Sequence, residues 1–249
     1  MGTLFNIQSF SPELALIIGN IFSYIVSPKY KLFLTLKEKI KIAPNIYDFI
    51  FSSNKKINFE PGQYMEWTLP QADPDSRGNR RYLTLASSPT EADIRIGVKY
   101  YDSPSSFKQQ LLKSGGTIVA SQLAGDFVLP KDKKEKLVLV AGGIGVTPYR
   151  SMIKYLKDTN ELRDIILIYI NRSADEIVYK DVLEYVKTMY INTSETGHLS
   201  SEKIINDIPD YLNRTWYISG PHAMVNAIEK MLNEMKVKKI KTDFFPGLV

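Results

Sequence analysis

Residues 137–148 read Leu-Val-Leu-Val-Ala-Gly-Gly-Ile-Gly-Val-Thr-Pro, and they constrain the fold of this chain more strongly than any other stretch. Five apolar residues end in a cluster of glycines, and an amphipathic segment follows. This order predicts a buried parallel strand, a tight turn and the start of a helix. Thr147 is suited to cap that helix, and Pro148 has the fixed φ that favours the first helical position.

The glycines of this turn also indicate a site for an anionic ligand. Gly143 and Gly145 lack the Cβ atoms that would keep a ligand away from the backbone. The helix that follows presents unpaired N–H groups and a partial positive charge at its first turn. A pyrophosphate fits such a turn, and a plain strand-to-helix turn without a ligand is the alternative.

Length and composition set the broad class. The chain has 249 residues, the size of about two domains. Its net charge is +5, but the sequence has no stripe of basic residues interleaved with aromatic ones, which argues against nucleic-acid binding. The mild positive charge suits an acidic protein partner or an anionic membrane surface. It contains no cysteine, which excludes disulfides and iron–sulfur ligation within the chain and fits the cytoplasm. Its two histidines, His198 and His222, are too few to predict a metal site.

The first 29 residues form a segment of their own, because nearly every residue from 14 to 26 is apolar. This run is shorter than the about 20 residues that span a bilayer, and it lacks the features of a signal peptide. Two interpretations are open: a helix packed on the body of the protein, or an interfacial anchor or the tail of a membrane segment. In the second case Lys29 and Lys31 would mark the cytoplasmic side of the membrane.

Residues 30–133 predict a β-rich domain. Apolar and polar residues alternate over 32–37, 47–51 and 94–100, and turn signals separate these runs. Short strands of this kind are typical of an antiparallel barrel. A helix is expected over 105–113, and a polar surface loop over 71–79.

Residues 134–249 predict an α/β domain that begins after the charged hinge at 131–136. Strands and helices alternate here, which indicates a parallel sheet with ligands at the carboxyl ends of its strands. The expected strands are 137–141, 165–170, 189–192, 216–219 and 240–245. The expected helices are 148–157, 180–187, 200–207 and 222–235.

Three further segments carry candidate ligand contacts. Arg172 follows Asn171 at the end of the second parallel strand, where an arginine can accommodate a ribose 2′-phosphate, although a solvated strand end is equally expected. The turn at 219–221 faces the same cleft. On the strand near residue 82, Arg81 can bind a phosphate bidentately and Thr84 can hydrogen-bond a flavin ring nitrogen.

Taken together, several motifs resemble the ferredoxin–NADP reductase superfamily over about residues 31–249. They are Pro61-Gly62-Gln63, Arg81-x-x-Thr84-x-Ala86-Ser87, Gly125-Asp126-Phe127, residues 142–148, Gly220-Pro221 and the ending at 243–247. The resemblance implies an antiparallel six-stranded Greek-key flavin-binding barrel followed by a Rossmann-like parallel-sheet nucleotide-binding domain. It also implies FAD and either NADH or NADPH as cofactors, which meet at the interface between the two domains.

The resemblance assigns site residues one by one. Those implied to bind FAD are Arg81, Tyr82, Leu83, Thr84, Val98, Lys99, Ser105, Ser106, Phe107 and Phe127. Those implied to bind the nicotinamide nucleotide are Gly142, Gly143, Gly145, Thr147, Pro148, Asn171, Arg172, Gly220, Pro221 and Met224. Those expected on the reacting face are Thr84, Ser219, Asp243 and Phe245.

Three positions depart from the superfamily's pattern. Leu83 stands where a tyrosine usually stacks on the flavin, so either Leu83 packs on the ring or the strand register is shifted to Tyr82. Ser219 replaces the usual cysteine, and Ser103 replaces a glycine before the phosphate helix.

The expected activity is hydride transfer from NAD(P)H to FAD, with electrons passing to a separate acceptor. The chain would be the reductase module of a membrane-associated system, in the cytoplasm or at the cytoplasmic face of the membrane. Two alternatives stay open: a flavin-binding sensory or docking subunit with little turnover, and a subunit that only relays electrons within a complex. The basic segment at 236–241 is either a docking site for an acidic carrier or a solvated helix end.

Overall fold

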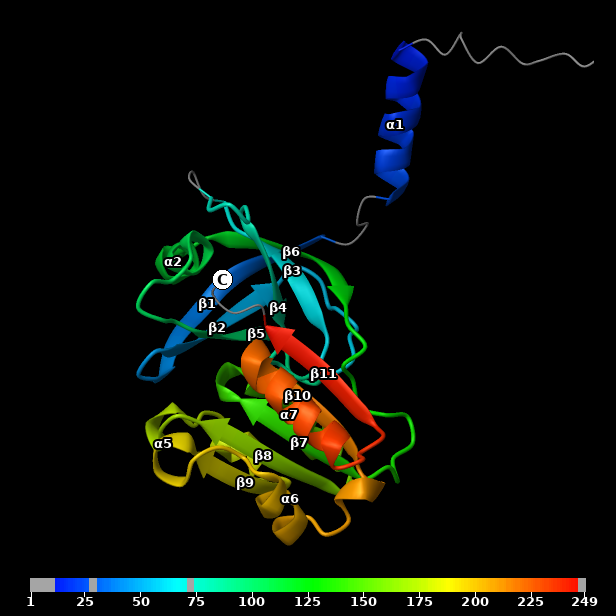
Figure 1. Ribbon diagram of the computed structural model, residues 1–249. Coiled ribbons are helices and arrows are strands. Elements are labelled where there is room, and N and C mark those ends of the chain that lie inside the picture. Colours follow the sequence, from blue (N-terminus) through cyan, green and yellow to red (C-terminus); the bar gives the residue numbers. More distant parts are fainter. Residues whose placement is uncertain (1–11, 27–30, 71–73, 246–249) are drawn as a thin grey trace, which may run out of the picture.

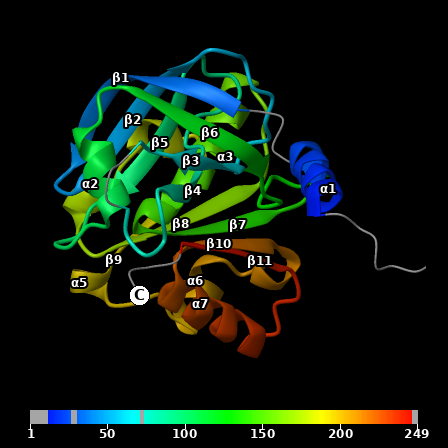
Figure 2. The same ribbon diagram turned by 90° about the horizontal axis from the view of Figure 1, so that it is seen from above.

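The computed structural model describes residues 12–26, 31–70 and 74–245, which form two sheets and a separate helix (Figure 1). The first sheet lies above the second in that view, and the helix α1 stands to one side of both in Figure 2.

The first sheet has six strands in the order β4-β3-β6-β1-β2-β5, and every neighbouring pair is antiparallel. Its strands are β1 (Lys31–Ala43), β2 (Ile46–Ser53), β3 (Tyr64–Thr68), β4 (Arg80–Thr84), β5 (Ile94–Lys99) and β6 (Thr117–Ala124). The sheet curls around a core that includes Phe49, Phe51 and Trp67, and α2 (Ser106–Lys113) adds Phe107 to it. The predicted antiparallel barrel is confirmed as this curled sheet.

The second sheet has five parallel strands in the order β11-β10-β7-β8-β9. Its strands are β7 (Leu137–Gly142), β8 (Ile165–Asn171), β9 (Lys187–Asn192), β10 (Thr215–Pro221) and β11 (Ile240–Phe245). Its helices are α3 (Thr147–Asp158), α4 (Lys180–Leu183), α5 (Thr193–Thr196), α6 (Ser201–Asp207) and α7 (His222–Glu234). Short 3₁₀ turns lie at Gly143–Val146, Ala174–Glu176 and Tyr211–Asn213.

Both faces of the second sheet are covered, which explains the continuous apolar runs of its strands. Leu137 and Leu139 point to a core shared with α3 and α4, whereas Val138 and Val140 point to a core shared with α6 and α7. The predicted α/β alternation is therefore confirmed. The helix expected over 180–187 is wrong in length, because the chain must already be extended at Lys187 to pair with β8.

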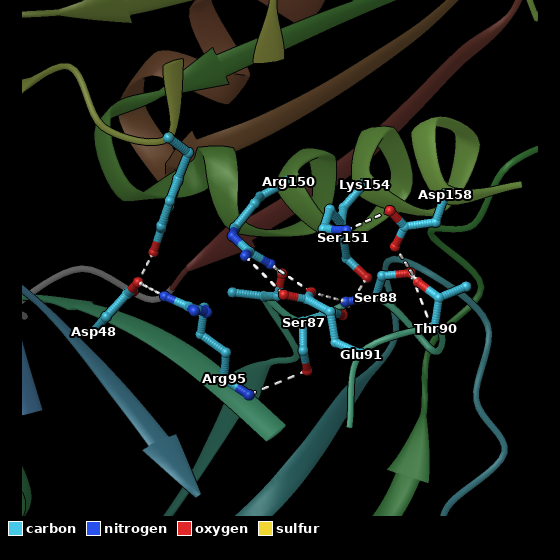
Figure 3. Close-up of polar contacts among 12 residues, drawn as sticks. Asp48, Ser87, Ser88, Thr90, Glu91, Arg95, Arg150, Ser151, Lys154 and Asp158 are labelled. Atoms are coloured by element: carbon cyan, nitrogen blue, oxygen red, sulfur yellow. Dashed lines mark hydrogen bonds and ion pairs between the residues drawn. The ribbon is translucent and has the colours of Figure 1, made fainter. Parts of the chain in front are cut away.

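Polar side chains join the two sheets (Figure 3). Arg150 of α3 donates to the carbonyl oxygen of Ala86 at 2.6 Å and to both carboxylate oxygens of Glu91, at 2.8 and 3.0 Å. One residue further on, the hydroxyl of Ser151 donates to the carbonyl of Ser87 at 2.6 Å. The loop after β4 is therefore clamped onto α3. The predicted boundaries after residues 29 and 133 stay predictions.

A third link involves Tyr179, whose hydroxyl donates to the buried carboxylate of Asp48 on β2. The other oxygen of Asp48 accepts from Arg95 of β5 at 2.5 Å. The Arg150 guanidinium lies over the Tyr179 ring, 5.4 Å from its centroid. These contacts hold α4 and α3 of the second sheet against β2 and β5 of the first.

Helix α1 spans Pro12–Val26 and carries six large apolar side chains that are 44–68% exposed. They are Leu14, Leu16, Ile17, Ile18, Ile21 and Phe22. The two interpretations of this segment, a packed helix or a membrane contact, stay predictions. Within the described residues, no helix combines the length and the apolar character needed to cross a membrane.

Candidate functional site

A cavity of about 650 Å³ lies between the two sheets. Its lining comes from β4, β5 and the start of α2 in the first sheet, and from the carboxyl ends of β7, β8 and β10 with α7 in the second. The predicted site residues that line it are Arg81, Tyr82, Leu83, Thr84, Val98, Lys99, Ser105, Phe107, Gly142, Gly143, Thr147, Asn171, Arg172, Pro221 and Met224. The structure thus brings together residues from both halves of the chain.

The turn after β7 opens the backbone to this cavity at one glycine. Gly143 has a φ of 51°, and a Cβ built there would meet no described atom within 4 Å. Gly145 is closely packed, because a Cβ there would lie only 2.4 Å from the carbonyl oxygen of Ser219, and its predicted contact with the nucleotide stays a prediction. Gly145 therefore lets the turn pack against β10, whereas Gly143 leaves space for a ligand. Gly142 and Gly220 likewise serve close packing, since a Cβ at either would clash with Met224.

The helix α3 begins differently from the sequence expectation. A 3₁₀ turn, Gly143–Val146, precedes it, and its N-cap is Val146, which makes no side-chain capping bond. Thr147 is the first helical residue, and its hydroxyl donates to the carbonyl of Ile144 at 3.1 Å. Pro148 follows it and is buried.

The carboxyl end of β10 carries a buried hydroxyl. Ser219 is fully buried, and its Oγ has no hydrogen-bond partner in the described part of the chain. Asp243 of β11 lies opposite Ser219 in the parallel ladder. Burial and the negative charge of Asp126 raise the pKa of the Asp243 carboxyl to about 6. Phe245 pairs with Pro221 through the backbone, and its side chain lies outside the described residues.

Strand β4 places both Tyr82 and Leu83 at the cavity without a shift of register. It pairs with β3 residue by residue from Arg80 to Thr84, so its register is regular. Tyr82 is 55% exposed, packs edge-on against Tyr64 at 5.5 Å and donates its hydroxyl to Gln122. Leu83 is half-buried, and Thr84 is buried at 6% exposure.

Arg81 is held by a dense set of contacts at the cavity wall. Its Nη2 lies 2.6 and 2.7 Å from the two carboxylate oxygens of Asp75. Its Nη1 donates to the backbone carbonyls of Arg77, Gly78 and Arg80. The guanidinium carbon lies 5.4 Å from the centre of the Phe107 ring.

The remaining predicted residues do not line the cavity. Among the described side chains they are Ser106, Phe127, Gly145, Pro148, Ser219, Gly220 and Asp243. Phe127 packs in the core against the rings of Tyr149 and Tyr217, at 5.9 and 5.2 Å. The hydroxyl of Ser106 accepts from the backbone N–H of Asp75 at 3.0 Å.

Residues 139–230 match the model of the oxidoreductase NAD-binding domain family. The chain is 26% identical over 223 residues to flavohemoprotein A of Dictyostelium discoideum, covering 81% of this chain and 56% of that protein. It is 25% identical to the glycine betaine monooxygenase reductase subunit of Chromohalobacter salexigens, covering 78% of this chain and 58% of that protein. These similarities support the ferredoxin–NADP reductase-like superfamily that the sequence motifs resemble.

Solved structures of this superfamily share the fold. The cytochrome P450 reductase GcoB of Amycolatopsis superposes with a TM-score of 0.73 at 21% identity, covering 87% of this chain and 70% of that one. Ferredoxin–NADP⁺ reductase of Plasmodium falciparum gives 0.71 at 19% identity, covering 87% and 97%. The chain spans less than two thirds of the length of the flavohemoproteins that it matches, for example 56% and 59% of two of them.

The cavity is also lined by residues that the sequence analysis did not predict. They include Arg77, Lys108, Glu176 and His198. Lys108 donates to the carbonyl of Lys99 at 2.7 Å, and burial together with the charge of Arg77 lowers the pKa of its ammonium group to about 8. Lys99 forms an ion pair with Glu176 at 2.7 Å that joins β5 to the loop after β8. Lys108 could have been predicted, because it lies in the first turn of the expected phosphate-binding helix α2. Glu176 and His198 lie in connecting segments, and no motif in the sequence marks them as cavity residues.

Proposed function

We propose that this chain is an NAD(P)H-dependent flavoprotein reductase that binds FAD on the first sheet and the nicotinamide nucleotide on the second. Electrons pass from the flavin to a separate acceptor. The observation that carries the proposal is one cavity to which both sheets contribute, with β4 and β5 on one side and the carboxyl ends of β7, β8 and β10 on the other. Ligands of open parallel sheets bind at that edge.

The residues present fit the two cofactors. Gly143 supplies an open backbone at the start of the 3₁₀ turn that leads into α3, where N–H groups and the helix dipole favour a phosphate. Ser105 caps α2 beside Arg81 and Phe107, which offers hydroxyl and cationic groups for the FAD diphosphate. Thr84 and Val98 line the cavity from strands β4 and β5. The apolar side chain of Val98 suits contact with the flavin ring, and the hydroxyl of Thr84 suits a hydrogen bond to it.

The flavin and the nicotinamide supply the hydride chemistry when they are bound. The chain's own residues orient the rings, exclude water and hold protons. Thr84 carries a buried hydroxyl at the cavity, and the buried hydroxyl of Ser219, on β10, has no hydrogen-bond partner in the described part of the chain. Asp243 keeps its carboxyl protonated to about pH 6, since burial and Asp126 raise its pKa. Thr84 lines the cavity and is the proposed residue of the reacting face, whereas Ser219 and Asp243 lie outside the lining and are proposed to support that face from β10 and β11.

The proposal is tested by an anaerobic titration of FAD-loaded protein with NADH and, separately, with NADPH. Loss of the flavin's visible absorbance with one nucleotide supports the reductase function. Flavin that is bound but unchanged by either nucleotide contradicts it and favours a docking subunit with little turnover. Arg172 lines the cavity at the end of β8, so we expect NADPH to be the better reductant.

We further propose that α1 contacts a membrane surface at the cytoplasmic face. Support comes from its six exposed apolar side chains, which would be shielded at a lipid interface. The test is flotation with anionic vesicles, comparing the full chain with an Ile17→Glu/Phe22→Glu variant. Leu162→Glu is the matched control, because Leu162 is an 83% exposed leucine on the body of the protein. Equal flotation of all three proteins would contradict membrane contact through α1.

A further inference from the structure

A tight turn lies against the residues proposed to hold the FAD diphosphate. The N–H of Gly78 donates to the carbonyl of Asp75 at 2.8 Å, and Gly78 has the left-handed φ of 72° that such a turn requires. The N–H of Arg77 donates to the Asp75 carboxylate at 3.0 Å. The turn is fixed on α2, because the N–H of Asp75 donates to the hydroxyl of Ser106 at 3.0 Å.

This turn engages the terminal nitrogens of Arg81. A guanidinium has five N–H donors. In Arg81 the Nη2 group contacts both oxygens of the Asp75 carboxylate, at 2.6 and 2.7 Å, and the Nη1 group contacts three backbone carbonyls. Only Nε is buried without a partner among the described residues. Protein oxygens therefore already accept from both terminal nitrogens of Arg81, and those that accept from Nη2 belong to Asp75.

A carboxylate and a phosphate compete for the same donors, because a guanidinium binds both through parallel N–H···O bonds. The Asp75 carboxylate also cancels the charge of Arg81, and their hydrogen bonds lower the pKa of Asp75, so it stays ionised at neutral pH. Two further cations, Arg77 and Lys108, line the cavity beside this pair. They keep the site attractive to an anion while Arg81 is engaged.

We propose that Asp75 sets the affinity for the flavin nucleotide by competing with its diphosphate for the guanidinium of Arg81. Binding exchanges one anion for another on the same cation, and the carboxylate of Asp75 moves into solvent. This inference rests on the proposed binding of FAD by the first sheet. Asp75 affects FAD only through Arg81. Removing the carboxylate of Asp75 therefore strengthens FAD binding, although it adds no contact between the protein and FAD.

The test measures the dissociation constant of FAD by fluorescence for the full chain and four variants. They are Asp75→Asn, Asp93→Asn, Arg81→Met and the Asp75→Asn/Arg81→Met double variant. Asp93 is the matched control, because it is an acidic residue of the same domain that pairs with Lys37 at 2.7 Å away from the cavity lining. Its substitution makes the same change in net charge.

We expect Asp75→Asn to bind FAD about tenfold more tightly, on the scale of one charge-assisted contact, and Asp93→Asn to bind like the unchanged chain. In the Arg81→Met background the Asp75 substitution should bring no gain. An unchanged or weaker affinity in Asp75→Asn, with binding still dependent on Arg81, overturns this inference alone. If Arg81→Met binds FAD as tightly as the unchanged chain, the proposed diphosphate site is wrong. If neither the unchanged chain nor any of the four variants binds FAD, the proposed function and this inference are both wrong.

Discussion

Replacing Arg150 with methionine tests how the two sheets are held together. Arg150 is 5% exposed and makes three hydrogen bonds, one to the carbonyl of Ala86 and two to the carboxylate of Glu91. Methionine keeps the apolar stem and removes all three. Hydrogen bonds to charged groups contribute about 1.5–3 kcal/mol, and breaking a fully buried ion pair costs roughly 3–5 kcal/mol.

The loss is partly compensated, since the Glu91 side chain is 20% exposed and keeps the N–H of Ser88 at 2.7 Å. We therefore expect the free energy of unfolding to fall by about 3 kcal/mol, which corresponds to roughly 6–12 °C in melting temperature. Urea denaturation followed by tryptophan fluorescence reports on both sheets, because Trp67 lies in the first and Trp216 in the second, each buried.

The matched control is Lys154→Met, one turn further along α3. Lys154 forms an ion pair with Asp158, and both side chains are about a quarter exposed, so its loss should change stability by less than about 0.5 kcal/mol. An Arg150→Met protein that is as stable as Lys154→Met would refute the view that this contact clamps the sheets.

The same clamp has a pH signature. Burial raises the pKa of Glu91, but the hydrogen bonds and charge of Arg150 outweigh it, so the folded-state pKa lies below the ordinary 4.5. A carboxyl with a lowered pKa stabilises the fold above the unfolded-state pKa and loses this effect as the pH falls through the folded-state pKa. The stability difference between the unchanged chain and Arg150→Met should therefore shrink below about pH 4.5. A constant difference from pH 7 to pH 3 would contradict this account.

Three further outcomes follow from the site. Gly145→Ala should unfold at clearly lower urea than Gly143→Ala, because its Cβ would lie 2.4 Å from a backbone oxygen, whereas Gly143→Ala should chiefly weaken nucleotide binding in a dialysis assay. Asp243 has a pKa raised to about 6, so the fold should lose stability as the pH rises from about 4 to 6, and Asp243→Asn should abolish this loss in urea titrations. Arg172→Ala should weaken NADPH binding by about tenfold and NADH binding little, on the scale of one charged contact to the 2′-phosphate; equal losses for both nucleotides would refute that role.

The periodicity of apolar residues predicted the two kinds of strand, and with them the two kinds of sheet. Alternation over 94–100 and the continuous apolar run of 137–141 each reflect how many faces of a strand are buried, which is a local property of the sequence. The sheet orders 4-3-6-1-2-5 and 11-10-7-8-9 have no such local signature, because they depend on which strands meet after folding.

The motifs predicted many residues of the cavity wall, such as Arg81 and Thr84, but not how each residue packs. Gly143 and Gly145 look alike in the sequence, and only the packing of Ser219 against the turn distinguishes a ligand-facing glycine from a packing one. Asp75 belongs to a loop that was interpreted as polar surface, yet its carboxylate binds Arg81. Contacts between residues of different elements, such as Lys99 with Glu176, leave no spacing pattern to detect.

Rapid-mixing reduction of the FAD-loaded chain by NAD(P)H carrying deuterium at nicotinamide C4 tests the central claim most directly. If one cavity brings both rings together, the flavin absorbance falls in a single turnover, and deuterium slows that fall by a primary isotope effect. No loss of absorbance with either nucleotide, with both cofactors bound, would contradict the claim that the cavity between the two sheets is a site of hydride transfer.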